Sequence, residues 1–387
     1  MMKKLHIINL GKMGGVETLF LQYIKENKGD SIICIGNDIG EEIKRQMPKT
    51  KVLFASRIFN KFKFRWPQFL RKHLLQLKIK CVDADIIIVW DLVPGIATKP
   101  KRGKLIYYDH GCSWRYEKNK KTLHFFSMVD GVISVSHASK RVMESRFELQ
   151  CVPSVVKNRI NKPEGISTAT KMAGIPLRLG TASRLVTLKG ISVILLTMQE
   201  LILRGHNVLL EIAGKGPDIE LFEQLSNSLN LKDKVVFSGF QHRMADFYNR
   251  TDVYLSTPIT EPFGLSAMEA LYFGIPVIFP FVDGQPEAIE DDVCGIGIIP
   301  SVSVSEHKKL TGIEIDFPHD VYDPMSDMLI KPKLISHIEC ADAVERLMSH
   351  DTYTKMSQNA KNHTSKNLNY HLFQKEFENT LKFYVEQ

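Results

Sequence analysis

The sequence predicts an α/β protein built from two successive, doubly wound halves. Short apolar runs of strand length alternate with stretches in which apolar residues recur at helical spacing. The short runs are apolar at nearly every position, which is typical of parallel strands buried on both faces of a sheet. The series occurs twice, and a polar stretch with three prolines at residues 153–176 is expected to link the halves. A ligand is expected in the crevice between them, at the carboxyl ends of the strands.

The first series opens with an apolar run at residues 5–10, which ends in a glycine-containing turn before a helical pattern at residues 16–24. Strand, glycine turn and helix in this order begin an α/β unit. The strands of this half are predicted at residues 5–10, 31–35, 51–54, 85–90, 105–108 and 131–135.

The second series repeats the alternation after the polar stretch. Its strands are predicted at residues 177–181, 208–213, 235–238, 253–256 and 276–279, and its helices at 191–204, 219–229 and 265–273. Residues 301–336 show no clear period and are expected to form an inserted loop or a small excursion, with helices following at 341–348 and 373–384. We therefore expect an N-terminal domain at residues 1–160, a C-terminal domain at 161–370, and a last helix at 371–387 that packs back on the N-terminal domain.

Composition indicates an ordinary globular protein. The 387 residues suggest two domains at roughly 150 residues each. The six cysteines lie far apart without a Cys-x-x-Cys pair, which argues against a zinc site and a disulfide framework and for a reducing compartment. No signal peptide is recognisable, and no apolar stretch approaches the roughly 20 residues of a membrane span. A cytoplasmic protein is expected.

The net charge of +8 is concentrated in one basic stretch, residues 59–80, which has seven lysines and arginines and no acidic residue. Aromatic residues and leucines are interleaved with the basic ones, and from Pro67 onward they recur at helical spacing. A basic amphipathic helix of this kind suits the headgroup layer of an anionic membrane, here the inner face of the cytoplasmic membrane. The alternative is a surface helix with a solvated basic face. Nucleic acid is not expected as a partner, because no nucleic-acid-binding module is recognisable.

Residues 257–278 combine a strand end, a turn and a helix start. Glu261 lies in the turn, where its carboxylate could accept hydrogen bonds from a sugar, and Glu269 lies about one turn into the helix, where it could accept two from a ribose diol. Backbone N–H groups at the helix start form a site for an anion or hydroxyl. They belong to Phe263, Gly264 and Leu265. For either glutamate alone, a helix cap or a solvent-facing residue is the simpler interpretation.

Residues 181–190 start as a strand and end as a turn into the next helix. Arg184 and Lys189 are expected at the carboxyl end of this strand. Two cations there suit a diphosphate, which gains negative charge as it departs. The alternative is a pair of exposed basic residues on a surface loop.

Other strand-to-helix turns supply weaker candidates. Gly214 lies in a Gly-Lys-Gly turn where the backbone could approach a ligand, and Phe240 could form a wall for a base. In the first half, Gly14 and Gly15 would let the backbone approach a ligand across the crevice, and His110 follows another strand. Taken singly, each also fits an ordinary turn or a structural histidine.

Together these segments resemble glycosyltransferase family 4, the retaining enzymes of the GT-B fold. The resemblance is strong over residues 177–289 and weak in the N-terminal half, and residues 152–160 and 301–336 depart from the family pattern. The segments that carry it are GGVET at 14–18, SRLVTLKG at 183–190, AGKGP at 213–217, FSGF at 237–240, EPFGLSAMEAL at 261–271, GIPVI at 274–278 and GQPEAI at 284–289.

The resemblance implies two Rossmann-like domains that face a central cleft, with a nucleoside-diphosphate sugar held mainly by the C-terminal domain. Arg184 and Lys189 match the family's diphosphate-binding pair. Glu269 matches its ribose-binding glutamate, and Glu261 the glutamate near the transferred sugar. Such enzymes are usually independent of metals and need no cofactor, which agrees with the lack of a DxD motif at the end of a predicted strand.

In the N-terminal half, Gly14 and Gly15 match the glycine loop that faces the phosphates, and His110 matches a histidine near the donor sugar. The implied reaction moves a sugar to a hydroxyl of a glycan or lipid-linked acceptor with retained configuration, in bacterial-type surface polysaccharide or lipopolysaccharide synthesis. It implies front-face attack, in which the departing phosphate takes the proton of the acceptor and Glu261 orients the sugar. Two alternatives stay open: a nucleotide-sugar 2-epimerase of the same fold, and a non-enzymatic membrane-associated subunit.

Overall fold

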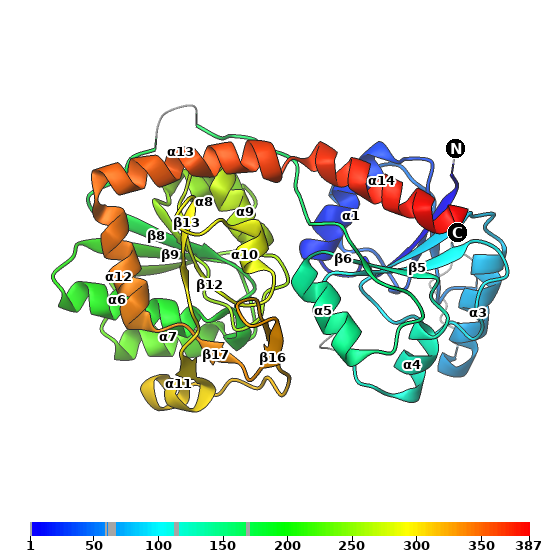
Figure 1. The fold of residues 1–387 in the computed structure, drawn as a ribbon, viewed down its shortest axis with the longest axis horizontal. Coiled ribbons are helices and arrows are strands. Elements are labelled where there is room, and N and C mark those ends of the chain that lie inside the picture. The colour runs from blue at the N-terminus through cyan, green and yellow to red at the C-terminus, as the bar shows by residue number, and fades with distance from the viewer. Residues whose placement is uncertain (1, 59, 61–66, 112–115, 168–170) are drawn as a thin grey trace. The chain divides into compact units, whose positions relative to one another are not determined.

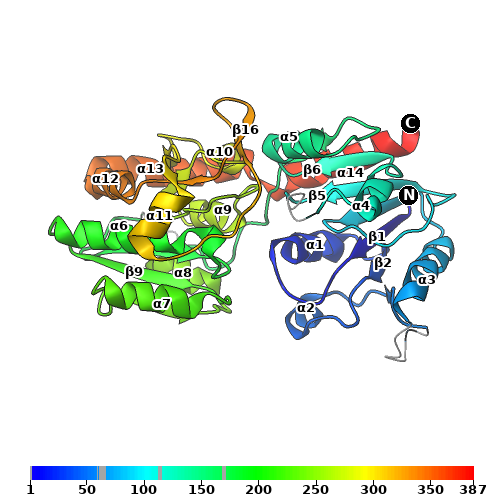
Figure 2. The same ribbon diagram turned by 90° about the horizontal axis from the view of Figure 1, so that it is seen from below.

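In the computed structural model the chain divides into two compact units (Figure 1). The structure describes residues 2–58, 60, 67–111, 116–167 and 171–387. The first unit comprises Met1–Ile160 together with Tyr370–Gln387, and the second comprises Asn161–Asn369. Each unit contains one large parallel sheet with helices on both of its faces (Figure 2).

The sheet of the first unit has seven parallel strands in the order β3-β2-β1-β4-β5-β6-β7. The chain begins in the middle of this sheet, moves outward to β3, and then crosses to β4 on the other side of β1. The switch point therefore lies between β1 and β4. The strands are β1 (Lys4–Ile8), β2 (Ser31–Cys34), β3 (Val52–Phe54), β4 (Ile86–Trp90), β5 (Lys104–Asp109), β6 (Gly131–Ser134) and β7 (Ser154–Val155).

The helices of the first unit cover a core of apolar residues from both faces of its sheet. Side-chain caps mark two helix starts, because Asn119 accepts a hydrogen bond from the backbone of Thr122, and Ser136 accepts one from Ser139. The helices are α1 (Gly15–Glu26), α2 (Glu41–Gln46), α3 (Gln68–Lys80), α4 (Lys120–Phe126), α5 (His137–Arg146) and α14 (Tyr370–Glu386).

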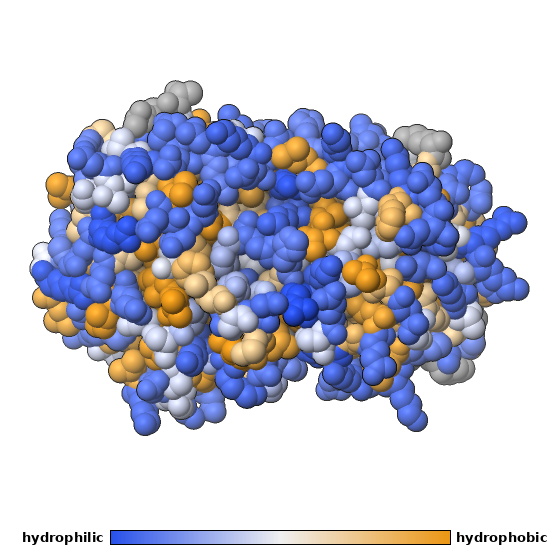
Figure 3. All heavy atoms as spheres, viewed as in Figure 1, coloured by the Kyte–Doolittle hydropathy of each residue, from blue (hydrophilic) through white to orange (hydrophobic). Residues whose placement is uncertain are grey.

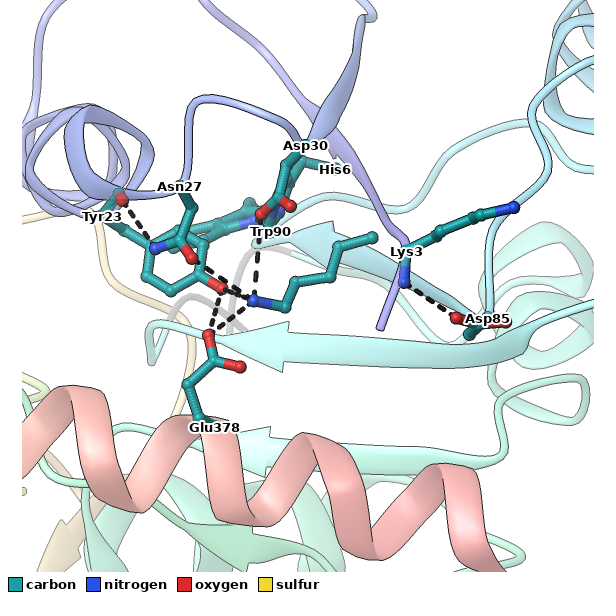
Figure 4. Close-up of polar contacts among 9 residues, drawn as sticks. Lys3, His6, Tyr23, Asn27, Asp30, Asp85, Trp90 and Glu378 are labelled. Atoms are coloured by element: carbon teal, nitrogen blue, oxygen red, sulfur yellow. Dashed lines mark hydrogen bonds and ion pairs between the residues drawn. The ribbon is translucent and has the colours of Figure 1, made fainter. Parts of the chain in front are cut away.

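Polar contacts attach the C-terminal helix α14 to the first sheet. Lys4 Nζ and the Tyr23 hydroxyl each donate to Oε1 of Glu378 at 2.6 Å, and Figure 4 shows Glu378 reaching from α14 toward Tyr23. Further along the helix, the Tyr384 hydroxyl donates to the carbonyl of Val132 at 2.9 Å. These groups are largely buried, so losing α14 would leave several polar atoms without partners.

The sheet of the second unit has six parallel strands in the order β10-β9-β8-β11-β12-β13. It follows the same plan as the first sheet, and its switch point lies between β8 and β11. The strands are β8 (Leu177–Ala182), β9 (Val208–Ala213), β10 (Val235–Gly239), β11 (Val253–Leu255), β12 (Val277–Pro280) and β13 (Gly295–Ile298). Two parallel, doubly wound α/β sheets confirm the predicted fold class.

The helices of the second unit enclose the other large core. They are α6 (Ile191–Leu203), α7 (Ile219–Ser228), α8 (Met244–Arg250), α9 (Leu265–Tyr272), α10 (Gln285–Ala288), α11 (Val304–Thr311), α12 (His337–Met348) and α13 (His350–Asn367), with a short 3-10 turn at Thr187–Lys189. The sequence pattern missed α13, because much of its buried face consists of small or weakly polar residues such as Ser357, Ala360 and Thr364.

Residues 301–336, expected to form an inserted loop or a small excursion, contain regular structure that the sequence pattern did not predict. Two small antiparallel sheets form there: β14 (Val302–Ser303) pairs with β17 (Lys333–Leu334), and β15 (Val321–Asp323) pairs with β16 (Met328–Ile330). These strands of two or three residues are too short to show a hydrophobic period. Helix α11 did leave a signal, because Ser303 and Glu306 form a capping box at its start.

The surface is mainly hydrophilic on the face drawn in Figure 3, with apolar residues scattered among polar ones. Across the part of the chain that the structure describes, no helix combines the length and apolar character needed to cross a bilayer.

Candidate functional site

The loops that follow β8 and β11 leave the second sheet side by side, because these strands are neighbours at its switch point. Backbone and side-chain hydrogen bonds join the two loops. The N–H of Ile259 donates to the carbonyl of Leu188 at 2.9 Å, and the Thr257 hydroxyl donates to the carbonyl of Gly190 at 2.9 Å. The segments that carry Lys189 and Glu261 are thus held against each other.

Gly190 makes this close approach possible. It adopts φ +65°, and a Cβ atom built on it would lie 1.9 Å from the backbone oxygen of Thr257. Any other residue would therefore face both the left-handed backbone conformation and a collision with the neighbouring loop. The close approach of the two loops therefore explains why a glycine ends the segment at residues 183–190.

Lys189 and Glu261 form an ion pair at the junction of the loops. Lys189 Nζ lies 2.5 Å from Oε2 of Glu261, and the two side chains are 28% and 17% exposed. The sequence placed both residues at strand ends, and the structure brings their charged groups into direct contact. An anionic ligand at this edge of the sheet would meet a lysine that already has a carboxylate partner.

Helix α9 begins at Leu265, just beyond the turn that contains Glu261 and Pro262. Its N-cap is Gly264 with φ +89°, and the first intrahelical bond runs from the N–H of Met268 to the carbonyl of Gly264. The backbone N–H groups before Met268 lack intrahelical acceptors and mark the positive end of the helix. Because the side chain of Phe263 is buried, only its backbone could contact a ligand.

Glu269 lies within α9, where its carboxylate is partly buried. The Tyr248 hydroxyl donates to its Oε2 at 2.8 Å. Burial raises the pKa of Glu269, and the hydrogen bond from Tyr248 opposes that rise. A neighbouring side chain thus holds the carboxylate, so Glu269 is not the fully solvent-exposed helix residue of the simpler interpretation.

Asp283, which the sequence did not single out, lies beneath the Glu261 loop. Its Oδ2 accepts from the Thr260 hydroxyl at 2.6 Å and from the N–H of Glu261 at 2.9 Å, while its Oδ1 accepts from the N–H of Tyr322 at 2.9 Å. Burial raises the pKa of Asp283 to about 6, with the hydrogen bonds opposing and the nearby charge of Glu261 adding to the rise. An Asp-Gly pair, as at 283–284, is typical of a turn, but the pair does not indicate which groups the aspartate contacts.

The remaining candidates of the second unit lie around the same sheet edge. Arg184 is exposed just after β8. Packing alone explains the glycine at position 214, since a Cβ there would lie 1.9 Å from the backbone oxygen of Ser183. Phe240 follows β10, is 40% exposed, and packs edge-on against His242 at 5.2 Å between ring centroids. Their contacts with a donor stay predictions.

In the first unit, the candidates lie after β1 and β5. Gly14 is the N-cap of α1 and Gly15 its first residue, and both are exposed. His110 is buried, and its ring stacks on Trp90 with centroids 5.6 Å apart and an interplanar angle of 16°. Its backbone N–H donates to Oδ1 of Asp91 at 3.3 Å.

A buried histidine supports the ring beneath His110. Trp90 Nε1 donates to Nδ1 of His6 at 3.0 Å, and His6 Nε2 lies 3.0 Å from Oδ2 of Asp30. An indole nitrogen can only donate, so His6 carries its proton on Nε2 and donates it to Asp30. Figure 4 shows His6 and Asp30 in contact next to Trp90.

The candidate residues thus divide between the two units: Gly14, Gly15 and His110 belong to the first, and the others to the second. That both groups meet a single ligand stays a prediction. Among the described residues, no group of three or more His, Cys, Asp or Glu side chains is arranged to hold a metal ion.

Comparison with known proteins places the ion pair and α9 within a recognised domain. Residues 175–310 match the family described as glycosyl transferases group 1. An uncharacterized glycosyltransferase of Methanocaldococcus jannaschii is 38% identical over 119 residues, which make up 30% of this chain and 30% of that protein. An uncharacterized glycosyltransferase of Haemophilus influenzae is 24% identical over 355 residues, 87% of this chain and 96% of that protein.

Solved structures extend the likeness to both units. Anabaena HepE, crystallised with UDP and glucose, has a TM-score of 0.74 with this chain at 17% sequence identity, covering 99% of this chain and 100% of that one. At this identity the likeness concerns the fold, and it confirms the GT-B fold that the sequence resemblance implied.

Proposed function

We propose that this chain, whose residues 175–310 are a glycosyl transferases group 1 domain, moves a sugar from a nucleoside-diphosphate sugar to a hydroxyl of a glycan or lipid-linked acceptor. The observation that carries the proposal is the contact of Lys189 with Glu261 at the start of α9. A cation, a carboxylate and free backbone N–H groups together suit a ligand that joins a diphosphate to a sugar.

In this proposal Lys189 and Arg184 hold the diphosphate and stabilise the charge that grows on it as it departs. Glu261 accepts hydrogen bonds from the sugar hydroxyls, and Glu269 holds the ribose. Gly14, Gly15 and His110 approach the phosphates and the sugar from the first unit. The acceptor hydroxyl attacks the face of the anomeric carbon that the phosphate leaves, so configuration is retained and the phosphate takes the proton.

The lysine and arginine would supply the charge stabilisation for which other enzymes use a divalent cation. We therefore expect turnover to persist in excess EDTA. A requirement for Mg²⁺ or Mn²⁺ would remove this part of the proposal.

A screen of UDP, GDP and ADP, each free and joined to a sugar, tests the proposal by thermal stabilisation. A ligand at about 100 times its dissociation constant adds about 2.7 kcal/mol to the free energy of unfolding. One base should stabilise the protein clearly more than the other two, and its effect should fall in Lys189→Ala. No stabilisation by any of the six compounds would contradict a sugar-nucleotide site.

Incubating the radiolabelled sugar nucleotide without acceptor then separates the two enzyme activities. A transferase leaves the donor intact or hydrolyses it slowly, whereas a 2-epimerase converts its sugar. Nucleotide binding without any turnover in the presence of bacterial lipid and glycan extracts would favour a non-enzymatic subunit.

For the acceptor, we propose a glycan or lipid-linked precursor at an anionic membrane surface, as in surface polysaccharide or lipopolysaccharide synthesis. Much of the basic stretch at 59–80 lies outside the described residues, but α3 is described. Its Leu75 and Ile79 pack in the core, while Lys72, Leu77 and Lys80 are exposed. An exposed leucine between two exposed lysines suits a headgroup layer.

Cosedimentation with vesicles of phosphatidylglycerol tests this surface. Lys72→Gln with Lys80→Gln should reduce binding, whereas Lys101→Gln with Arg102→Gln, which removes the same charge from another exposed part of the first unit, should reduce it less. Equal binding by both double variants would remove α3 from the proposal.

A further inference from the structure

The backbone of Glu261 is held by two consecutive residues of another loop. Its N–H donates to Oδ2 of Asp283 at 2.9 Å, and its carbonyl accepts from the N–H of Gly284 at 3.2 Å. The preceding residue is tied to the same carboxylate, since the Thr260 hydroxyl donates to Oδ2 of Asp283 at 2.6 Å. The loop that carries Glu261 therefore rests on residues 283–284.

Asp283 is in turn fixed by the β15–β16 hairpin. Its N–H donates to the carbonyl of Tyr322 at 2.9 Å, and the N–H of Tyr322 donates back to its Oδ1 at 2.9 Å. Asp283 has φ +46° and is 4% exposed, so its backbone lies in the left-handed region and its carboxylate is enclosed by neighbouring groups. One buried carboxylate thus connects the hairpin with the Glu261 loop.

We propose that Asp283 is a positioning residue which, fixed by the β15–β16 hairpin, sets the place of Glu261 against the sugar of the donor. This inference rests on the proposed function. It gives a role to the hairpin within residues 301–336, the stretch that departs from the family pattern. Lys189 holds the Glu261 carboxylate from one side, and Asp283 holds the Glu261 backbone from the other.

The carboxylate is suited to this role because all of its side-chain partners are donors. Two N–H groups and one hydroxyl point at its two oxygens. An asparagine has the same shape and tolerates the left-handed backbone, but its amide NH₂ would face at least one of these donors. Asp283→Asn therefore changes the chemistry of the support while keeping its volume.

The experiment compares binding of the free nucleoside diphosphate with binding of its sugar nucleotide, using the base found in the screen. Asp283→Asn should weaken sugar-nucleotide binding about tenfold and leave binding of the free diphosphate within about twofold. Thr260→Val, which removes a single hydrogen bond to Asp283, should have a smaller effect in the same direction. It serves as the second variant if Asp283→Asn folds poorly.

A double-mutant cycle separates positioning from general support of the fold. If Asp283 acts through Glu261, then Glu261→Gln combined with Asp283→Asn should bind the sugar nucleotide no more weakly than Glu261→Gln alone. The matched control is Asp252→Asn. Asp252 is another buried carboxylate, and it accepts from the N–H groups of Gly174 and Arg178. It lies just before β11, whereas the Glu261 loop follows that strand.

The outcomes are distinct. A wild-type protein that binds no sugar nucleotide overturns the proposed function. If the wild type binds the sugar nucleotide, two results would overturn only the positioning role. One is an equal loss of affinity for the free diphosphate and the sugar nucleotide in Asp283→Asn. The other is a loss of affinity in Asp283→Asn that adds to the loss in Glu261→Gln.

Discussion

Lys189 Nζ lies 2.5 Å from Oε2 of Glu261, so the group proposed to hold the diphosphate is paired with the group proposed to hold the sugar. Without a ligand, each charge is partly neutralised by the other. In the proposed function, a bound diphosphate would give the lysine a second, more highly charged partner, and the Glu261 carboxylate would become available to sugar hydroxyls. On this proposal, the ion pair keeps both side chains in place before a donor binds.

Lys189→Ala should lower turnover about 10²- to 10³-fold, because the growing charge on the leaving diphosphate loses a direct cationic partner. Steady-state rates with saturating donor measure this loss. The control is Lys232→Ala, which removes an exposed lysine before β10 and should leave the rate unchanged. A Lys189→Ala rate close to that of the control would show that the lysine has no catalytic part.

Glu269→Gln should weaken binding of the free nucleoside diphosphate about tenfold, because a neutral amide accepts hydrogen bonds from a diol less strongly than a carboxylate. Tyr248→Phe should give a smaller loss, since it removes the hydroxyl that donates to Oε2 and to the carbonyl of Ser266 but leaves the Glu269 carboxylate in place. Calorimetric titration measures both, with Glu220→Gln on the exposed face of α7 as the control. If the 2′-deoxynucleotide loses as much affinity in Glu269→Gln as the ribonucleotide, the contact is not with the ribose.

Much of the fold could be predicted from the sequence, because strands buried on both faces leave apolar runs that are easy to recognise. The strands around the two switch points, β1, β4, β8 and β11, lie where those runs predicted them. Lys189 and Glu261 could be placed at one sheet edge, since each follows a strand of a parallel sheet. Their direct contact depends on how two loops pack, which the sequence does not display.

The missed features share a physical cause, which is that their stabilising contacts are not periodic. Asp283 is held by partners 23, 22 and 39 residues away along the chain, so no local pattern reveals it. Helix α13 buries few strongly apolar residues, and β15 and β16 have three residues each. In each case, tertiary contacts define the element and propensity contributes little.

The buried histidine His6 should make the first unit less stable in acid. Burial lowers its pKa below the ordinary value of 6.5, although Asp30 opposes the shift. Below that value the unfolded chain binds more protons than the folded one, so the free energy of unfolding falls as the pH falls. Protonation of His6 at Nδ1 would also remove the acceptor of the Trp90 Nε1–H group, so that two N–H donors would face each other.

His6→Gln isolates this effect, because its amide cannot gain a proton in this range. The variant should lose about 1 kcal/mol at neutral pH for an imperfectly replaced hydrogen bond. Its stability should then change less than that of the wild type between pH values of about 7.5 and about 5. Urea unfolding followed by circular dichroism gives both free energies. If the free energy of unfolding falls equally in the two proteins as the pH is lowered, the pH dependence belongs to other groups.

Gly190→Ala tests whether the contact between the β8 and β11 loops forms the site. An alanine at φ +65° costs about 1–2 kcal/mol for the backbone conformation alone. Gly312 provides the matched control, since it has φ +70° and nothing lies within 4 Å of a Cβ built on it. Gly312→Ala should therefore show only the backbone cost, seen as a modest fall in melting temperature.

Gly190→Ala adds the collision with the backbone oxygen of Thr257, which raises the expected cost to about 2–5 kcal/mol. Relief of that collision must move the Lys189 loop away from the loop that carries Glu261. Nucleotide binding should fall with stability in this variant, whereas Gly312→Ala should bind as the wild type does. The contrary outcome is that both variants show the same small loss of stability and bind the nucleotide equally well. The two loops could then separate without loss of binding, and their close packing at the switch point would not be what brings Lys189 and Glu261 together.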